Sequence, residues 1–170
     1  MKTGNVNTIK EFRLFNGLSD KELKLVSDIA RRKNVDAGTA IIVEDETGDD
    51  LYLLEEGVVD INKTLTIMTS KYDSGTKERS FIRLTGEQHP YFGEMALFGK
   101  GERSATVKAV NECKLLMITS EDFRKLCDSE PRIGFIVVTN IALVLADYLR
   151  KTNEDVIKLT TALSLALSGE

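Results

Sequence analysis

The sequence predicts a mainly β fold, a sandwich or barrel, with helices on either side of it in the chain. Between residues 33 and 118 the apolar residues fall in short runs of strand length, and turn residues separate these runs at close intervals. Before and after this region the apolar residues follow helical spacing instead. The chain has 170 residues, which is enough for one domain with a sizeable core and a peripheral element.

Two short helices are predicted at the N-terminus. Ile9, Phe12 and Phe15 recur at helical spacing and form one apolar stripe. Ser19, followed three residues later by Glu22, is a capping box, and the helix that it starts is expected to run to about residue 32. We expect the apolar residues of both helices to pack in the core.

Short strands are predicted from residue 33 on. The expected strands are residues 41–43, 51–54, 58–68 and 81–84. Between them we expect an acidic turn at 44–50, a turn at 55–57 and an exposed hairpin tip at 69–80. Residues 105–110 and 114–118 are expected to form a last hairpin.

The C-terminal third is predicted to be helical. Ser120 or Thr119 can cap a short helix through Cys127, and Pro131 is well suited to open a longer one. From there to about Leu167 apolar or small residues recur at spacings of three and four, as in a coiled coil. This seam stripe is Phe135, Val138, Ala142, Leu145, Leu149, Thr152, Val156, Leu159, Leu163 and Ala166.

A second stripe on the same helix, formed by Ile133, Ile136, Ile141, Val144 and Tyr148, is expected to face the barrel. A helix with two apolar stripes needs two partners. We interpret these as the chain's own barrel and the same helix of a second copy, so a homodimer is expected. A helix folded back inside a monomer is the alternative. The chain thus divides into a barrel with N-terminal helices (1–130) and a lid or dimerisation helix (131–170).

Residues 92–107, FGEMALFGKGERSATV, carry the candidate site. Glu94 precedes Arg103 by nine residues, and Gly93 lies beside Glu94. An Arg fork suits two phosphate oxygens, a carboxylate accepts hydrogen bonds from sugar hydroxyls, and glycine lets backbone N–H groups approach an anion. The pattern therefore indicates a small anionic sugar phosphate. The alternative for an arbitrary pair of this kind is two solvated loop charges.

This stretch resembles the phosphate-binding cassette of the cyclic-nucleotide-binding domain family, which reads F-G-E-x-A-L, a short gap, then R-[SAT]-A-T-V. Residues 92–97 and 103–107 fit it, whereas Glu102 stands where many members carry Pro. The segments LFNGLSDKELKLV and GDDLYLLEEGVVDINK are also similar to the family. The resemblance covers roughly residues 8–150 and implies a double-stranded β-helix, or jelly-roll barrel. The tip at 69–80 and the lengthened turn at residues 88–90 depart from the family pattern.

The resemblance implies a cyclic nucleotide as ligand and a role for each matching residue. Arg103 would pair with the cyclic phosphate, Ser104 would donate to it, and Glu94 would accept a hydrogen bond from the ribose 2′-hydroxyl. Leu97 and Val107 would line the apolar wall, whereas Thr106 is read either as a strand residue or as a ligand contact. The full predicted binding set is Gly93, Glu94, Met95, Ala96, Arg103, Ser104, Ala105, Thr152 and Asn153.

Thr152 and Asn153 belong to this set because they are expected to contact the base of the nucleotide. The catabolite-activator branch of the family carries a Thr-Ser pair at what looks like this point and reads adenine with it, partly from the neighbouring subunit. The first residue matches, and the amide of Asn153 can both donate and accept. We therefore expect cAMP rather than cGMP. A polar residue that fixes the register of a coiled coil is the other reading of Thr152.

Composition excludes several other classes. A net charge of −4 argues against nucleic acid as a main partner, and a single histidine, His89, all but excludes a metal-dependent enzyme of the related barrel type. Cys113 and Cys127 read as free thiols in a reducing compartment. We expect a cytoplasmic sensor, not an enzyme, without a membrane span or a helix-turn-helix, that signals to a downstream protein the sequence does not identify. A docking barrel that has lost its ligand is the alternative.

Overall fold

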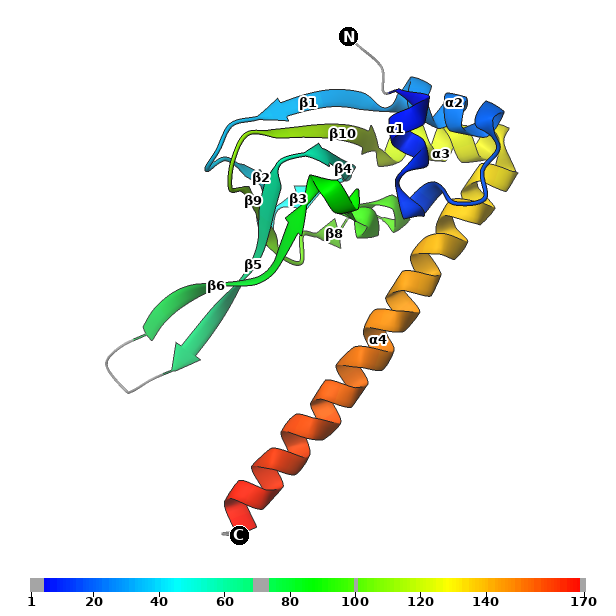
Figure 1. The fold of residues 1–170 in the computed structure, drawn as a ribbon. Coiled ribbons are helices and arrows are strands. Elements are labelled where there is room, and N and C mark those ends of the chain that lie inside the picture. Colours follow the sequence, from blue (N-terminus) through cyan, green and yellow to red (C-terminus); the bar gives the residue numbers. More distant parts are fainter. Residues whose placement is uncertain (1–4, 69–73, 100, 169–170) are drawn as a thin grey trace.

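The computed structural model describes residues 5–68, 74–99 and 101–168 of the chain. Two four-stranded antiparallel sheets, a first sheet β1-β10-β4-β7 and a second sheet β2-β9-β5-β6, form the barrel with a two-stranded pair, β3-β8 (Figure 1). The strands are β1 (Arg31–Val35), β2 (Ala40–Ile42), β3 (Thr47–Gly48), β4 (Asp50–Glu56), β5 (Val58–Met68), β6 (Ser74–Thr85), β7 (Tyr91–Phe92), β8 (Gly101–Glu102), β9 (Thr106–Ala109) and β10 (Cys113–Thr119). The predicted mainly β jelly roll is confirmed.

The chain folds back on itself at the β5–β6 hairpin, so that each strand pairs with its counterpart on the returning half. The pairs are β5 with β6, β4 with β7, β3 with β8, β2 with β9 and β1 with β10. Further pairing of β10 with β4 and of β5 with β9 closes the two sheets. This arrangement places β3 beside β8, more than fifty residues later in the chain. The outer half of the hairpin projects from the barrel (Figure 1).

The two central strands of the first sheet, β4 and β10, are covered on both faces, which explains their apolar runs, whereas the edge strand β1 is exposed except at Val35. In β4, Leu51 and Leu53 belong to a core shared with the helices, whereas Tyr52 and Leu54 belong to the core between the sheets. The helices are α1 (Val6–Lys10), η1 (Arg13–Phe15), α2 (Asp20–Ile29), η2 (Gly86–Gln88), η3 (Glu94–Phe98), α3 (Ser120–Ser129) and α4 (Pro131–Ser168), the η elements being 3₁₀ turns.

The predicted caps are present. Ser19 and Glu22 form the capping box of α2, Thr119 caps α3, and Pro131 is the first residue of α4. Ile9 and Phe12 are fully buried, as expected, although the chain forms two short pieces, α1 and η1, instead of one helix. Both cysteines are free.

Four predicted boundaries or pairings are wrong. The helix expected to reach residue 32 ends at Ile29, because residues from Arg31 on pair with β10. Glu55 and Glu56, expected in a turn, extend β4. Residues 74–80, expected in a hairpin tip, form the start of β6, and residues 69–73 lie outside the described part of the chain.

The expected last hairpin does not exist either. β9 pairs with β2 and β5 in the second sheet, whereas β10 pairs with β1 and β4 in the first sheet. The turn at residues 111–112 therefore carries the chain from one sheet to the other. Two adjacent strands look alike in sequence whether they pair with each other or with distant strands, because side-chain alternation reports only which face is buried.

Helix α4 has two halves. In its first half Ile133 and Ile141 are fully buried, as predicted for the inner stripe, and Ile136 and Val144 are half-buried. The buried face also includes Val137, which the predicted stripe left out, whereas Tyr148 at the end of the stripe is 59 % exposed. From residue 147 to residue 168 every position is exposed, and Figure 1 shows this half extending away from the barrel. Within the described chain the helix is not folded back on the barrel.

Among the described residues, α4 is also the one helix long and apolar enough to cross a membrane by length and composition. The same property is expected of a helix whose exposed face packs against a second protein chain. The expectation of no membrane span, and with it the cytoplasmic location, stays a prediction.

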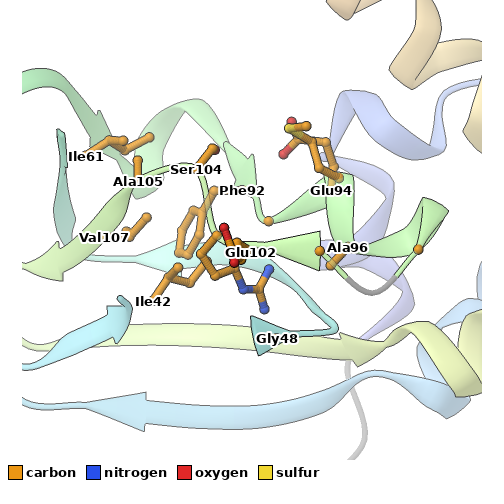
Figure 2. A pocket seen from close by; sticks show the side chains of 15 residues that line it. Ile42, Gly48, Ile61, Phe92, Glu94, Ala96, Glu102, Ser104, Ala105 and Val107 are labelled. Carbon is orange, nitrogen blue, oxygen red and sulfur yellow. The ribbon is translucent and has the colours of Figure 1, made fainter. Parts of the chain in front are cut away.

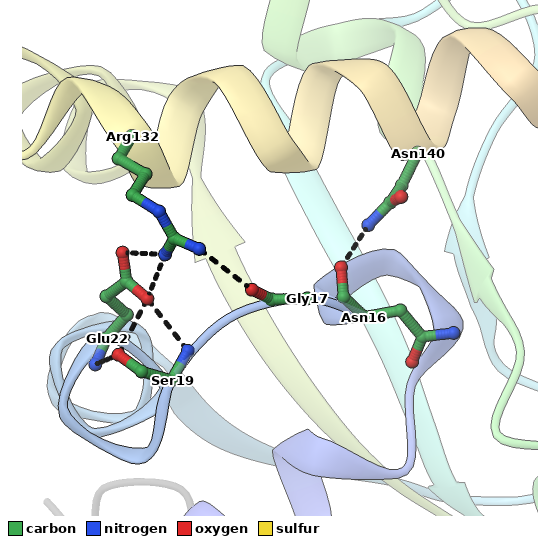
Figure 3. A network of polar contacts seen from close by, with 6 residues as sticks. All are labelled: Asn16, Gly17, Ser19, Glu22, Arg132 and Asn140. Carbon is green, nitrogen blue, oxygen red and sulfur yellow. Dashed lines mark hydrogen bonds and ion pairs between the residues drawn. The ribbon is translucent and has the colours of Figure 1, made fainter.

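Polar contacts tie the first half of α4 to the N-terminal segment (Figure 3). Arg132 donates to both carboxylate oxygens of Glu22 and to the carbonyl of Gly17. Two turns later the side-chain amide of Asn140 donates to the carbonyls of Leu14 and Asn16, at 3.0 and 2.9 Å. The capping box of α2 and the end of η1 are thus joined to α4, which fixes the direction in which the long helix leaves the domain.

This network predicts a pH dependence of stability. Hydrogen bonds from Arg132 and then Ser19 lower the pKa of Glu22 from 4.5 to about 2. The unfolded chain therefore binds this proton more tightly, so the stabilisation is complete above pH 4.5 and is lost as the pH falls to about 2. Arg132→Met should reduce the free energy of unfolding at pH 6, and the difference from the parent should shrink towards pH 2. Urea unfolding between pH 2 and pH 6 measures both effects.

Lys125→Met is the matched control, because it breaks the exposed i,i+4 pair with Glu121, which is screened by solvent. Its effect should be the smaller one. A loss for Arg132→Met that is equal at pH 2 and pH 6 would contradict the assignment.

Candidate functional site

A pocket of about 240 Å³ opens between the second sheet, the β3-β8 pair and η3. Seven of the nine predicted binding residues line it, namely Gly93, Glu94, Met95, Ala96, Arg103, Ser104 and Ala105. Figure 2 shows Ile42, Ile61 and Val107 grouped at one end of the pocket and Glu94 at the other. The volume is below the ~300–1,000 Å³ typical of small-molecule sites, so the pocket suits the polar part of a ligand better than a whole nucleotide.

The local backbone holds Arg103 in place. Its N–H donates to the carbonyl of Glu46, and its carbonyl accepts from the N–H of Asp45, both at 2.9 Å. Its side chain is half-buried, and Nη2 donates to the carbonyl of Asp50 at 3.1 Å. The guanidinium is thus a positive group fixed on the pocket wall by neutral backbone, and no described ion pair cancels its charge.

Glu94 begins η3 directly after Gly93, whose φ of 80° is in the left-handed region that favours glycine. Burial raises the pKa of Glu94, whereas its own backbone N–H and the Arg103 charge act in the opposite direction. Glu94 and Arg103 are not paired with each other in the structure, but they share one cavity. A bound molecule with a negative group at one end and a hydroxyl at the other could contact both.

The other predicted wall residues divide into correct and incorrect assignments. Val107 lines the pocket as expected. Leu97 does not, because it points into the core beneath the N-terminal helices. Thr106 is a strand residue, and its hydroxyl accepts from the N–H of Glu44 at 3.0 Å. Glu102, which is not in the predicted binding set, lies in β8 and lines the pocket.

The sequence reasoning missed the pocket residues that three strands distant in sequence supply. Ile42, Ile61 and Gly48 line the pocket from β2, β5 and β3. Phe92 forms part of the lining too, and behind it Tyr52 stacks on its ring, with centroids 5.6 Å apart. The apolar alternation in β2 and β5 signals inward-facing side chains, but only strand pairing shows which of them end at the pocket.

A second aromatic contact shapes the turn before the site. His89 adopts a left-handed conformation with φ of 46° and packs edge-to-face against Phe12, with ring centroids 5.4 Å apart. The lengthened turn at residues 88–90 is therefore packed on the N-terminal helices and does not line the pocket. No cluster of metal-ligating residues occurs in the described ranges.

Thr152 and Asn153 do not join the pocket. Both are exposed on the outer half of α4, which extends away from the barrel. Within one copy of the chain they therefore contact none of the other predicted binding residues, and a role for them requires a second copy.

The comparisons with known proteins agree with this geometry. The family model described as the cyclic nucleotide-binding domain matches residues 32–130. A cyclic AMP receptor protein from Thermus thermophilus is 33 % identical over 141 residues, which is 82 % of this chain and 58 % of the relative. A cAMP-dependent protein kinase regulatory subunit from Yarrowia lipolytica is 31 % identical over 118 residues, 69 % of this chain and 28 % of the relative.

Among solved structures, the catabolite activator protein of Thermus thermophilus superposes with a TM-score of 0.72 at 31 % identity. The match covers 87 % of this chain and 63 % of that structure. The chain therefore spans less than two thirds of each of these three relatives.

Because the Glu94 carboxylate is partly buried, we expect it to lower the stability of the folded protein at neutral pH. Because burial raises the pKa of Glu94 above its ordinary 4.5, folding favours the protonated form. Stability therefore falls as the pH rises from 4.5 through the higher pKa of the folded state. Without ligand, Glu94→Gln should melt at a higher temperature than the parent at pH 7, and the gain should disappear below about pH 4.5. Differential scanning fluorimetry at pH 4 and pH 7 tests this.

Glu102→Gln is the control, because Glu102 is an exposed carboxylate lining the same pocket. Its melting temperature should change little at either pH. A Glu94→Gln protein that melts below the parent at pH 7 would contradict the expected cost of burial.

Proposed function

We propose that this chain, which belongs to the cyclic nucleotide-binding domain family, binds cAMP in the pocket beside η3 and reports binding through α4. As a member of that family it is a cyclic nucleotide-binding regulatory domain. The observation that carries the proposal is that one cavity holds both Arg103 and Glu94, a fixed cation and a half-buried carboxylate.

In this proposal the cyclic phosphate lies against Arg103 and Ser104, and the ribose 2′-hydroxyl donates to Glu94. Arg103 can give two parallel N–H donors to phosphate oxygens, and its charge is not cancelled by a described ion pair. Gly93 and Ala96 allow backbone and sugar to approach closely, since neither carries a bulky side chain. Met95 and Ala105 complete the wall.

Two observations favour cAMP over cGMP. The similar proteins from Thermus and Yarrowia carry cyclic AMP in their names. Thr152 matches the first residue of the Thr-Ser pair with which the catabolite-activator branch reads adenine, and the Asn153 amide can both donate and accept. The small pocket volume supports a base that lies outside the cavity, where a helix can cover it.

We further propose that α4 pairs with α4 of a second copy. All ten residues of the seam stripe are exposed, including Phe135 at 73 %, Leu149 at 62 % and Leu163 at 59 %. Their alternating spacing of three and four is that of a two-helix seam, so a second copy of the same helix is the fitting occupant. Ligand binding could then shift the seam, to the extent that the ligand prefers one arrangement of α4 over the other.

The first prediction of this proposal concerns Arg103. Arg103→Ala should weaken cAMP binding by ~2–4 kcal/mol, because the phosphate charge would lose its buried partner. Isothermal titration calorimetry measures the change, after a thermal-shift comparison of cAMP, cGMP, cyclic dinucleotides and AMP has identified the preferred ligand. Arg83→Ala is the control, since Arg83 pairs with Asp60 on the barrel surface away from the pocket. Arg103→Ala binding cAMP as tightly as the parent would overturn the site assignment.

The second prediction concerns the seam. Leu149→Glu together with Val156→Glu places two charges in the proposed helix pair and should convert a dimer of the full chain into monomers at micromolar concentration. Lys158→Glu changes a charge on the same helix outside the seam stripe and should leave the dimer intact. Multi-angle light scattering gives the mass of each protein. A parent chain that is already monomeric under these conditions would refute the seam.

A further inference from the structure

The guanidinium of Arg103 lies in a slot between two glycines. A Cβ built on Gly48 would lie 2.5 Å from Nε, 2.6 Å from Nη2 and 2.9 Å from Cζ of Arg103. A Cβ built on Gly93 would lie 3.1 Å from Nη1 of the same group. The planar side chain therefore passes where any residue other than glycine at position 48 would place its own side chain.

Backbone groups close the slot. The carbonyl of Asp50 accepts from Nη2 of Arg103 at 3.1 Å. Asp50 is itself held, because its carboxylate accepts from the hydroxyl of Tyr52 at 3.2 Å and its strand pairs with β10. Burial, reinforced by the Asp50 charge, raises the pKa of Tyr52 to about 12, so this hydroxyl stays protonated as a donor. The acceptor that orients Arg103 therefore has a fixed position.

The fold places Gly48 in this slot. Gly48 pairs with Gly101 in the β3-β8 ladder, two residues before Arg103 in the chain. The guanidinium has five N–H donors, and the Asp50 carbonyl uses one of them. Held in one plane, the group presents the remaining donors in a constant geometry. Such pre-ordering is what a two-point contact with a phosphate requires.

We infer that Gly48 is a positioning residue for phosphate recognition. Because it has no side chain, the Arg103 guanidinium can lie flat against β3, in the orientation that faces the ligand. This inference rests on the proposed function of the pocket. Gly48 does not need to touch the ligand. Its effect passes entirely through the orientation of Arg103, and that distinguishes it from the residues of the cassette.

Gly48→Ala tests the inference with little risk to the fold. The backbone of Gly48 is outside the left-handed region, and the atoms that the new methyl would meet belong to the far end of a flexible side chain. Arg103 should therefore swing away while the barrel stays folded. We expect the cAMP affinity to fall by about 10- to 100-fold, since displacement of a binding group by ~1 Å has effects of this size. An affinity equal to that of the parent would overturn the inference.

A double-mutant cycle separates positioning from a general effect on the pocket. If Gly48 acts through Arg103, Gly48→Ala should change the affinity by less than about twofold in an Arg103→Ala background. Equal losses in the two backgrounds would show that the methyl group acts on the ligand or the fold directly, and would overturn the positioning role.

A measurement without nucleotide keeps the two proposals distinguishable. The Arg103 Nε–H signal in NMR, assigned by its absence from Arg103→Lys, should shift in Gly48→Ala. It should stay in place in Gly101→Ala, because a Cβ on this paired glycine meets nothing within 4 Å. An unchanged signal in Gly48→Ala would overturn the inference even if the parent binds cAMP. If the signal shifts in Gly48→Ala but the parent binds no cyclic nucleotide, the slot would be supported and the proposed function refuted.

Discussion

The pocket depends on a pairing of only two residues with two residues, β3 with β8. Such a short ladder would not hold by itself, and it exists because the strands on either side of it are paired along the same fold-back of the chain. Five successive strands meet their counterparts in reverse order, so residues more than fifty apart come into register. Gly48, Asp50 and Arg103 meet for this reason, and a backbone carbonyl, not a described ion pair, holds the Arg103 guanidinium.

A fixed charge and a buried carboxylate weaken a fold unless other parts of it compensate. Here the first sheet supplies the compensation, because helices cover one of its faces and the second sheet covers the other. The carboxylate of Glu94 stays in the pocket wall, where burial raises its pKa. Desolvation of a carboxylate therefore falls at this site, which is a common pattern where a protein keeps groups ready for a ligand.

Helix α4 has one half packed on the domain and one half that extends away from the barrel (Figure 1). Its first half is bound to the N-terminal helices by Arg132 and Asn140, and it packs on α3, which in turn contacts η3. Its second half, through residue 168, is exposed at every described position and carries a continuous apolar stripe. At ~1.5 Å per helical residue, residues 147–168 carry this stripe about 30 Å beyond the packed part of the helix.

Local chemistry made part of this molecule readable from its sequence. Four features could be predicted from neighbouring residues alone, because caps, turns and loop motifs depend on short-range interactions. They are the capping box of α2, the proline that opens α4, the strand at residues 58–68 and the cassette at residues 92–107. The same reasoning failed for β9 and β10, for Leu97, and for Gly48. Alternation shows that a strand has a buried face, but it does not say against which strand that face packs. Long-range strand pairing decided that Gly48 lies next to Arg103, and packing of helices on the sheet decided that Leu97 turns away from the pocket. Neither interaction can be predicted from the residues adjacent to these positions in the sequence.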